Sequence, residues 1–169
     1  QTFEYPEEFF KERIHSIRRP RPDDFQIKEA AEKIKKSKNP IIISGGGVFY
    51  SNAMEELSNF ATKHNIPVTQ TVMGYSTMKR DHSHYAGQIG GLGGKNTNDL
   101  AKETDLAIAV GTKLADFTTG SWANFENEKF KLVSVNVSRF DANKHLAQAV
   151  VGDAKVSLIE LSKALGDWK

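Results

Sequence analysis

The residues best suited to chemistry in this chain are three consecutive glycines, Gly45, Gly46 and Gly47, which follow an apolar run at Ile41–Ile43. A β-branched run without charges is typical of a strand that is covered on both faces of a parallel sheet. Glycine lets the backbone turn sharply after such a strand and leaves bare N–H groups at the start of the next helix, where an anionic ligand can bind. A glycine turn also occurs without any ligand, so the pattern leaves both a phosphate site and a plain turn open.

The glycine segment matches the dinucleotide fingerprint Gly-x-Gly-x-x-Gly only in part. Tyr50 stands where the third glycine belongs. Thr69, Gln70 and Thr71 occupy the end of the next predicted strand, where an acidic residue would hold a ribose. These departures argue against a nicotinamide dehydrogenase, and the sequence contains no P-loop pattern either.

Other polar clusters indicate no catalytic residue. Asp81-His82-Ser83-His84 has three ligand-type side chains, but no further ligand cluster stands nearby in the sequence, so we expect a polar loop and no metal site. Lys113 and Asp116 are the best-placed charged pair, which an ordinary loop ion pair also explains. His15, His64 and His145 are isolated and are expected at the surface or at helix ends. The sequence has no Gly-x-Ser-x-Gly elbow and no paired carboxylates that would indicate acid–base catalysis.

The composition indicates one domain with balanced charge. The 169 residues, 38% of them apolar, are enough for one core, and the net charge of +2 argues against a nucleic-acid or membrane surface. The absence of cysteine excludes disulfides, thiolate zinc sites and cysteine nucleophiles. No apolar run approaches the roughly 20 residues of a membrane span, and the N-terminus is unlike a signal peptide, so we expect a cytoplasmic protein.

Strands and helices alternate in the predicted element order. Expected strands lie at residues 41–43, 68–71, 85–89, 106–110, 132–137 and 150–151. Expected helices begin after Asp23, in a capping box with Gln26, after Ser51, near Thr97 and after Asp153. This alternation predicts an α/β fold with a parallel sheet that has helices on both faces. Residues 1–22 are expected to be a linker arm that runs over a surface, and residues 23–169 to be the domain.

Ligands of such sheets bind where the parallel strands end. The expected rim comprises residues 45–48, 69–71, 90–93, 111–113 and 152–153.

The order of motifs resembles the central domain of thiamine-diphosphate-dependent enzymes such as acetohydroxyacid synthase and pyruvate oxidase. The resemblance covers about residues 24–169 and rests on the strand with Gly-Gly-Gly-Val, on Ile-Pro-Val, on Leu-Ala-Ile-Ala-Val-Gly-Thr-Lys-Leu and on Val-Val-Gly-Asp-Ala. Residues 9–20, 116–121 and 136–142 resemble, within this superfamily, hydrolases that open a cyclic diketone in myo-inositol catabolism. An acetolactate synthase-like parent that acts on 2-keto acids stays open as the alternative.

The resemblance implies a three-layer, Rossmann-like domain with a six-stranded parallel sheet of the NAD/FAD-binding type. It implies flanking pyrimidine- and pyrophosphate-binding domains as partners and a homo-oligomeric parent. Thiamine diphosphate and Mg are implied to bind outside this chain, because it ends at Gly166-Asp167-Trp168-Lys169 and carries neither the family's Gly-Asp-Gly motif with the Asn-Asn that follows it nor the activating glutamate of the other catalytic domain. Together with the missing initiator methionine, this suggests a piece of a longer enzyme that has no turnover by itself.

Flavin-binding relatives hold FAD in this domain, and the resemblance carries that site onto matching positions here. These positions are Gly45, Gly46, Gly47, Val48, Thr69, Gln70, Gly90, Gly111, Thr112, Lys113 and Asp153. The relatives' Gly-Ala-Arg-Phe-Asp-Asp-Arg is replaced here by a segment in which Lys113 stands for an arginine and Phe117 for a second one. Lysine offers a point charge in place of a planar fork, so we expect a vestigial or weak nucleotide site.

Three further alternatives stay open beside this reading. They are an FAD-binding module of the same fold, a sirtuin-like deacylase and a purely structural or oligomer-forming domain. The absence of cysteine for a zinc module and of a catalytic histidine motif argues against the deacylase.

Overall fold

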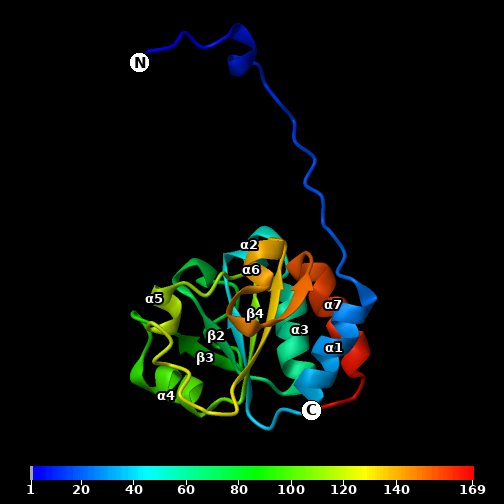
Figure 1. Ribbon diagram of the computed structural model, residues 1–169, viewed down its shortest axis with the longest axis vertical. Helices are drawn as coiled ribbons and strands as arrows, with labels where there is room; N and C mark the ends of the chain where they lie inside the picture. The colour runs from blue at the N-terminus through cyan, green and yellow to red at the C-terminus, as the bar shows by residue number, and fades with distance from the viewer. Residues whose placement is uncertain (1) are drawn as a thin grey trace.

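Six parallel strands form the centre of the computed structural model, which describes residues 2–169 (Figure 1). The strand order is β3-β2-β1-β4-β5-β6, and every neighbouring pair is parallel. The strands are β1 (Pro40–Ser44), β2 (Val68–Gln70), β3 (Tyr85–Gln88), β4 (Leu106–Val110), β5 (Lys131–Asn136) and β6 (Gln148–Val151). The predicted α/β fold and all six predicted strands are therefore confirmed.

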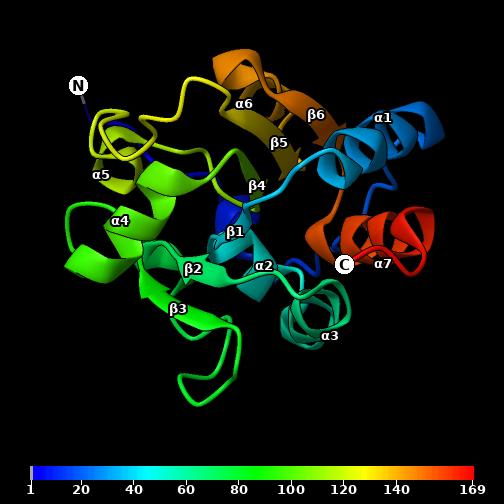
Figure 2. The same cartoon turned by 90° about the horizontal axis from the view of Figure 1, so that it is seen from below.

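Helices cover both faces of the sheet, as the view from below in Figure 2 shows. One face carries α1 (Asp24–Lys35), α3 (Met54–His64) and α7 (Ala154–Leu165), which pack on one another. The other face carries α4 (Lys95–Glu103) together with α5 (Asp116–Thr119) and the chain that follows it. The short helices α2 (Gly46–Tyr50) and α6 (Arg139–Ala142) follow β1 and β5, and three 3-10 turns are η1 (Glu7–Phe10), η2 (Val72–Gly74) and η3 (Lys144–Leu146).

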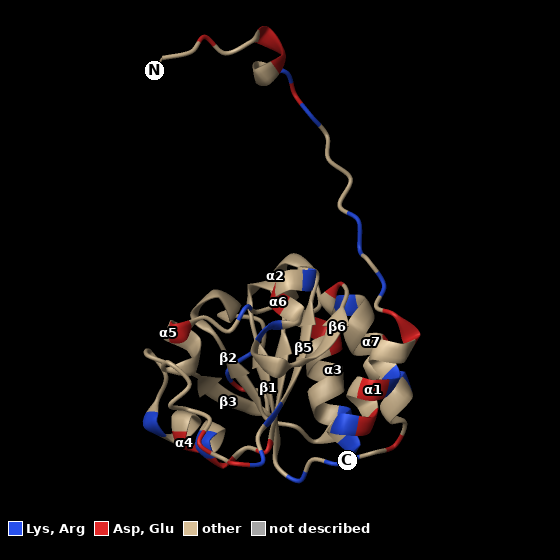
Figure 3. Cartoon of the chain, in the orientation of Figure 1, with Lys and Arg blue, Asp and Glu red and all other residues tan. Residues whose placement is uncertain are grey.

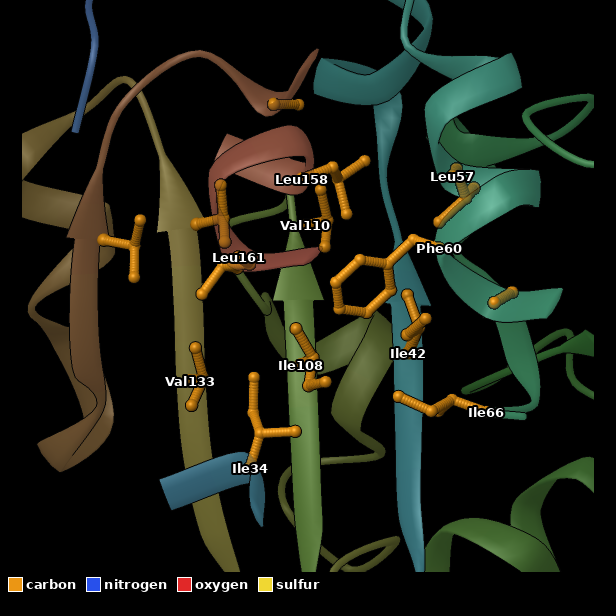
Figure 4. Packing of buried hydrophobic residues seen from close by; sticks show 14 of the residues in the cluster. Ile34, Ile42, Leu57, Phe60, Ile66, Ile108, Val110, Val133, Leu158 and Leu161 are labelled. Atoms are coloured by element: carbon orange, nitrogen blue, oxygen red, sulfur yellow. The ribbon is translucent and has the colours of Figure 1, made fainter. Parts of the chain in front are cut away.

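The alternation of side chains along the strands divides the core into two layers. Ile42 and Ile108 face the layer under α1, α3 and α7, where Phe60, Leu158 and Leu161 fill the space between helices and sheet (Figure 4). Ile41, Ile43 and the small residues Ala107 and Ala109 face the opposite layer. The unbroken apolar runs were therefore correct indicators of strands covered on both sides.

One predicted helix start and one predicted capping box differ in the structure. Ser51 caps no helix, because α2 already begins at Gly46 and Ser51 is the residue after its last turn. The Ser51 hydroxyl instead donates to Asp153 Oδ2 at 2.8 Å. Asp23 caps α1 as predicted, but Gln26 completes no capping box, since its side-chain oxygen accepts from the Val151 N–H at 2.9 Å.

His64 lies at a helix end, which is one of the two predicted places, but it does not lie at the surface. It is the last residue of α3, but its side chain is buried between Phe60 and Trp168. Burial lowers the pKa of His64, although its hydrogen bond to the Trp168 carbonyl partly opposes this shift. The neutral ring donates from Nδ1 to Trp168 O at 2.7 Å and lies 3.2 Å from Ser162 Oγ through Nε2, so it ties the C-terminal segment to α3.

The arm does not run over a surface along its whole length. Figure 1 shows that it projects from the end of the domain at which α2 and α6 lie, with η1 far from the sheet. Within residues 2–169, the hydrogen bonds between the arm and the domain come from residues 19–21, and Pro22 packs against Gly152. Within residues 2–169, no helix has both the length and the apolar character needed to cross a membrane.

Candidate functional site

The parallel strands end at one edge of the sheet, which is the upper edge in Figure 1, and most predicted site residues lie there. A cavity of about 450 Å³ opens at the ends of β5 and β6 beside α2. Of the eleven predicted site residues, it is lined by Gly47, Gly111 and Asp153. Its other walls include Tyr50, Asn136, Val137 and residues 17–20 of the arm.

The glycine segment is packed against the end of β4. The Gly45 N–H donates to Val110 O and the Gly47 N–H donates to Gly111 O, both at 2.9 Å. A Cβ on Gly47 would lie 2.6 Å from Gly111 Cα, and a Cβ on Gly45 would overlap Gly111 O. The glycines therefore allow two backbone segments to touch, and two of their N–H groups are already bonded within the protein.

Thr69 and Gln70 belong to the predicted rim, but their side chains are buried and bonded inside the protein. Thr69 Oγ1 donates to Ile42 O at 3.0 Å. Gln70 Nε2 donates to Thr77 Oγ1 at 3.2 Å and to Met78 O at 3.1 Å. Thr69 thus ties β2 to β1 and Gln70 fixes the chain after β2, and neither side chain lines the cavity.

Gly90 lies beyond β3, outside the cavity lining. Its φ of +93° and its close approach to the Phe117 carbonyl require glycine. Its N–H and C=O both bond the side chain of Asn98, at 3.0 and 3.1 Å. This position closes the turn into α4.

Lys113 is exposed and forms no ion pair with Asp116 among the described residues. Lys113 instead interacts electrostatically with Asp141, and Asp141 accepts a hydrogen bond from Lys144 Nζ at 2.7 Å. The Lys144 ammonium holds the pKa of Asp141 below its ordinary value, and Lys113 adds to this effect. Thr112 is bonded through its carbonyl to Asn136 Nδ2 at 3.2 Å, so it links the ends of β4 and β5.

Asp153 is the most completely bonded residue of the predicted site. Its Oδ1 accepts from the N–H groups of Lys155 and Val156 at 3.0 and 3.3 Å and so caps α7, as predicted. Its Oδ2 accepts from Ser51 Oγ at 2.8 Å and from Arg19 Nη1 at 3.0 Å. Sequence reasoning missed Arg19 as a partner, since no local spacing connects residues 134 positions apart.

These contacts do not fit a flavin dinucleotide. Two of the N–H donors in the glycine segment are bonded to the carbonyls of Val110 and Gly111, and both oxygens of Asp153 are bonded to α7, Ser51 and Arg19. Lys113 offers a single exposed ammonium where flavin-binding relatives are expected to carry an arginine fork.

The residues present do not fit thiamine diphosphate with a metal ion either. Gly166 ends α7 with a φ of +65°, and Trp168 is held by His64, so this segment closes a helix. Within residues 2–169, no group of three His, Asp or Glu side chains is arranged to hold a metal ion. His82 and His84 are bonded to Ser58 Oγ at 2.8 Å and Asn65 Oδ1 at 3.1 Å.

Comparison with known proteins gives consistent matches. A family model described as "Thiamine pyrophosphate enzyme, central domain" matches residues 27–161. The 3D-(3,5/4)-trihydroxycyclohexane-1,2-dione hydrolase of Clostridium perfringens is 44% identical over 98% of this chain. Hydrolase 1 of the same name from Bacillus cereus is 42% identical over 95% of it. The chain spans only 26% and 25% of these two relatives.

Solved structures agree in fold. A Mycobacterium smegmatis protein described as a thiamin diphosphate-dependent enzyme aligns with a TM-score of 0.73 at 20% identity, over 93% of this chain and 31% of its own. Benzoylformate decarboxylase from Polynucleobacter necessarius aligns with a TM-score of 0.71 at 22% identity, over 96% of this chain and 32% of the decarboxylase chain. At such identities these structures support the fold alone. The match of the family model over most of the chain shows more: this chain belongs to the family of thiamine pyrophosphate enzyme central domains.

Proposed function

We propose that the chain is the central domain of a thiamine-diphosphate-dependent hydrolase that opens the ring of 3D-(3,5/4)-trihydroxycyclohexane-1,2-dione in myo-inositol degradation. The observation that carries this proposal is the identity of 41–45% with hydrolases of that name. The match to the hydrolase of Clostridium perfringens covers 98% of this chain, so it extends into the arm.

In this proposal the domain is structural. It positions a pyrimidine-binding and a pyrophosphate-binding domain, which together hold thiamine diphosphate and Mg²⁺, in a homo-oligomeric cytoplasmic parent. The nucleotide site carried over from flavin-binding relatives is vestigial here, because its donors and its acidic residue are bonded within the domain.

The exposed apolar side chains support a face that other domains cover. Within residues 2–169, nine large ones follow the carboxyl ends of the strands, and they are Phe49, Tyr50, Val72, Met73, Tyr75, Leu92, Phe117, Val137 and Phe140. Clustering of this kind at one edge is typical of an interaction surface, because a protein rarely leaves a large contiguous apolar patch in water.

The test is to express the full-length parent and this 169-residue chain separately and to assay both, with added thiamine diphosphate and Mg²⁺. The expected result is ring opening of the diketone by the parent and no turnover by the isolated chain, because the chain offers no site for the cofactor. Conversion of a 2-keto acid such as pyruvate by the parent, without ring opening, would instead favour the acetolactate synthase-like alternative. Turnover by the isolated chain would contradict the structural role.

A further inference from the structure

The cavity beside α2 is closed on one side by the chain's own arm. Arg19 Nη1 donates to Ser51 O at 2.7 Å and to Asp153 Oδ2 at 3.0 Å. The backbone adds a bond, since the Asp153 N–H donates to Pro20 O at 2.9 Å. Two consecutive residues of the arm are thus bonded to the start of α7 and the end of α2. Figure 3 shows basic residues where the arm joins the domain.

Packing reinforces these bonds. Pro22 is buried against Gly152, where a Cβ would lie 2.9 Å from both the nitrogen and the Cδ of the proline. The absence of a side chain at Gly152 therefore makes the space that Pro22 occupies. Arg21 Nη2 adds an ion pair with Glu160 Oε1 at 2.7 Å on the exposed side of α7.

The rest of the arm makes no comparable contact among the described residues. Ile14 and Ile17 are 93% and 82% exposed. The side chain of Arg13 bonds only within the arm, to Glu8 O at 3.4 Å. The change from exposed to bonded chain at residue 19 marks a defined contact, which we call the arm site: Ser51, Gly152, Asp153 and Glu160.

Charge explains why Arg19 matters at this site. The Asp153 side chain is only 6% exposed, and burying a carboxylate is costly unless it is paired and hydrogen-bonded. Its two oxygens accept four hydrogen bonds, and the Arg19 guanidinium is the charged donor among them. A pair in this partly buried place is screened less by salt than an exposed pair.

We infer that the arm site binds the chain's own linker through Arg19, at the strand ends where sheets of this type otherwise take a nucleotide. Aspartate, glycine and serine here are a recognition surface for the segment Arg19–Pro22. This fixes the direction in which the arm leaves the domain, and with it the placement of any domain joined to the arm. The inference holds for a parent of either substrate class, so its failure would leave the proposed function untouched.

Trypsin can report on the arm site. The bonds after Arg19 and Arg21 precede proline and resist the enzyme, whereas cleavage after Arg18 requires residues 19–21 to leave the domain. Asp153→Asn keeps an oxygen that can cap α7 but removes the charge and turns an N–H donor toward Arg19. We expect cleavage after Arg18 to become about tenfold faster, since loss of a charged hydrogen bond raises the open population by that order.

Two controls accompany this experiment. Cleavage after Arg13, in the projecting part of the arm, should keep its rate in the same sample. Asp23→Asn is the matched variant, because the Asp23 side chain caps α1 in the same way but, among the described residues, accepts only from the N–H groups of Phe25 and Gln26. It should leave cleavage after Arg18 unchanged.

A second measurement does not depend on the stability of the Asp153 variant. In Arg19→Gln, the heteronuclear NOE of the backbone amides of residues 19 and 21 should fall from values typical of a rigid backbone to those of a mobile segment, while the amides of α1 keep their values. Unchanged cleavage after Arg18 in folded Asp153→Asn, or unchanged NOE values in Arg19→Gln, would overturn the inference.

Discussion

Replacing Gly47 by alanine is expected to destabilise the domain by about 2–3 kcal/mol, which is the usual cost of overpacking a tight contact. Helix propensity alone predicts the opposite sign, since alanine is better than glycine within a helix by about 1 kcal/mol. Packing should decide, because the new Cβ would lie 2.6 Å from Gly111 Cα and 3.0 Å from Gly111 O. Both are backbone atoms at the end of a central strand. Urea unfolding followed by circular dichroism measures the difference.

Gly46→Ala is the matched control in the same helix. The nearest atoms to its Cβ would be Met73 O at 3.1 Å and the Met73 and Tyr50 side chains at 3.5 and 3.7 Å, which have room to adjust. Met73 is exposed in the short turn η2, so its backbone oxygen needs to move by only a few tenths of an ångström, and the free energy of unfolding should change by less than ~1 kcal/mol. Equal stability of the two variants would mean that Gly47 and Gly111 do not need to touch.

Phe60→Ala should cost about 3–5 kcal/mol of unfolding free energy, the range for truncating a buried phenylalanine. Phe60 is 1% exposed and lies between α3, α7 and the sheet (Figure 4). Its ring centre is 4.8 Å from that of His64, so the cavity would also loosen the contact that holds Trp168. Thermal and urea unfolding of the 169-residue chain give the value.

Phe60→Leu serves as the control for Phe60→Ala, because it keeps most of the apolar volume and should lose clearly less stability. A loss of less than about 1 kcal/mol of unfolding free energy in the alanine variant would be typical of a substitution at the surface, and it would contradict the packing of Phe60 in this layer.

The fold was predictable because short segments of the sequence carry the pattern of buried parallel strands. Ile41–Ile43 and Leu106–Val110 are apolar without interruption, and parallel strands covered on both faces need such runs. The helix that begins at Gly46 was not predictable, since glycine is a poor helix former and the pattern after it is too short to show a period. The contact with Gly111 sets that helix start, and it joins residues far apart in the sequence.

The order of elements predicts which of the candidate site residues come together, but it does not predict which of their polar groups are already bonded within the protein. The carboxyl ends of parallel strands must share one edge, so the grouping of Gly47, Gly111 and Asp153 followed from the order of elements. Which polar groups are already bonded there depends on pairs such as Arg19 with Asp153, and no sequence pattern records these pairs. Gln70 illustrates the same limit, because alternation along a strand of three residues does not tell which side chains turn inward.

The claim that the glycine edge serves packing and linker binding, and not a nucleotide, is tested most directly by titrating the ¹⁵N-labelled chain with FAD. Amide signals of Gly45, Gly47 and Gly111 report on the groups that a dinucleotide would have to engage. They should stay in place up to about 1 mM ligand, a concentration that would reveal binding of only ~4 kcal/mol. Saturable shifts of these signals, or a yellow protein after dialysis, would contradict the account.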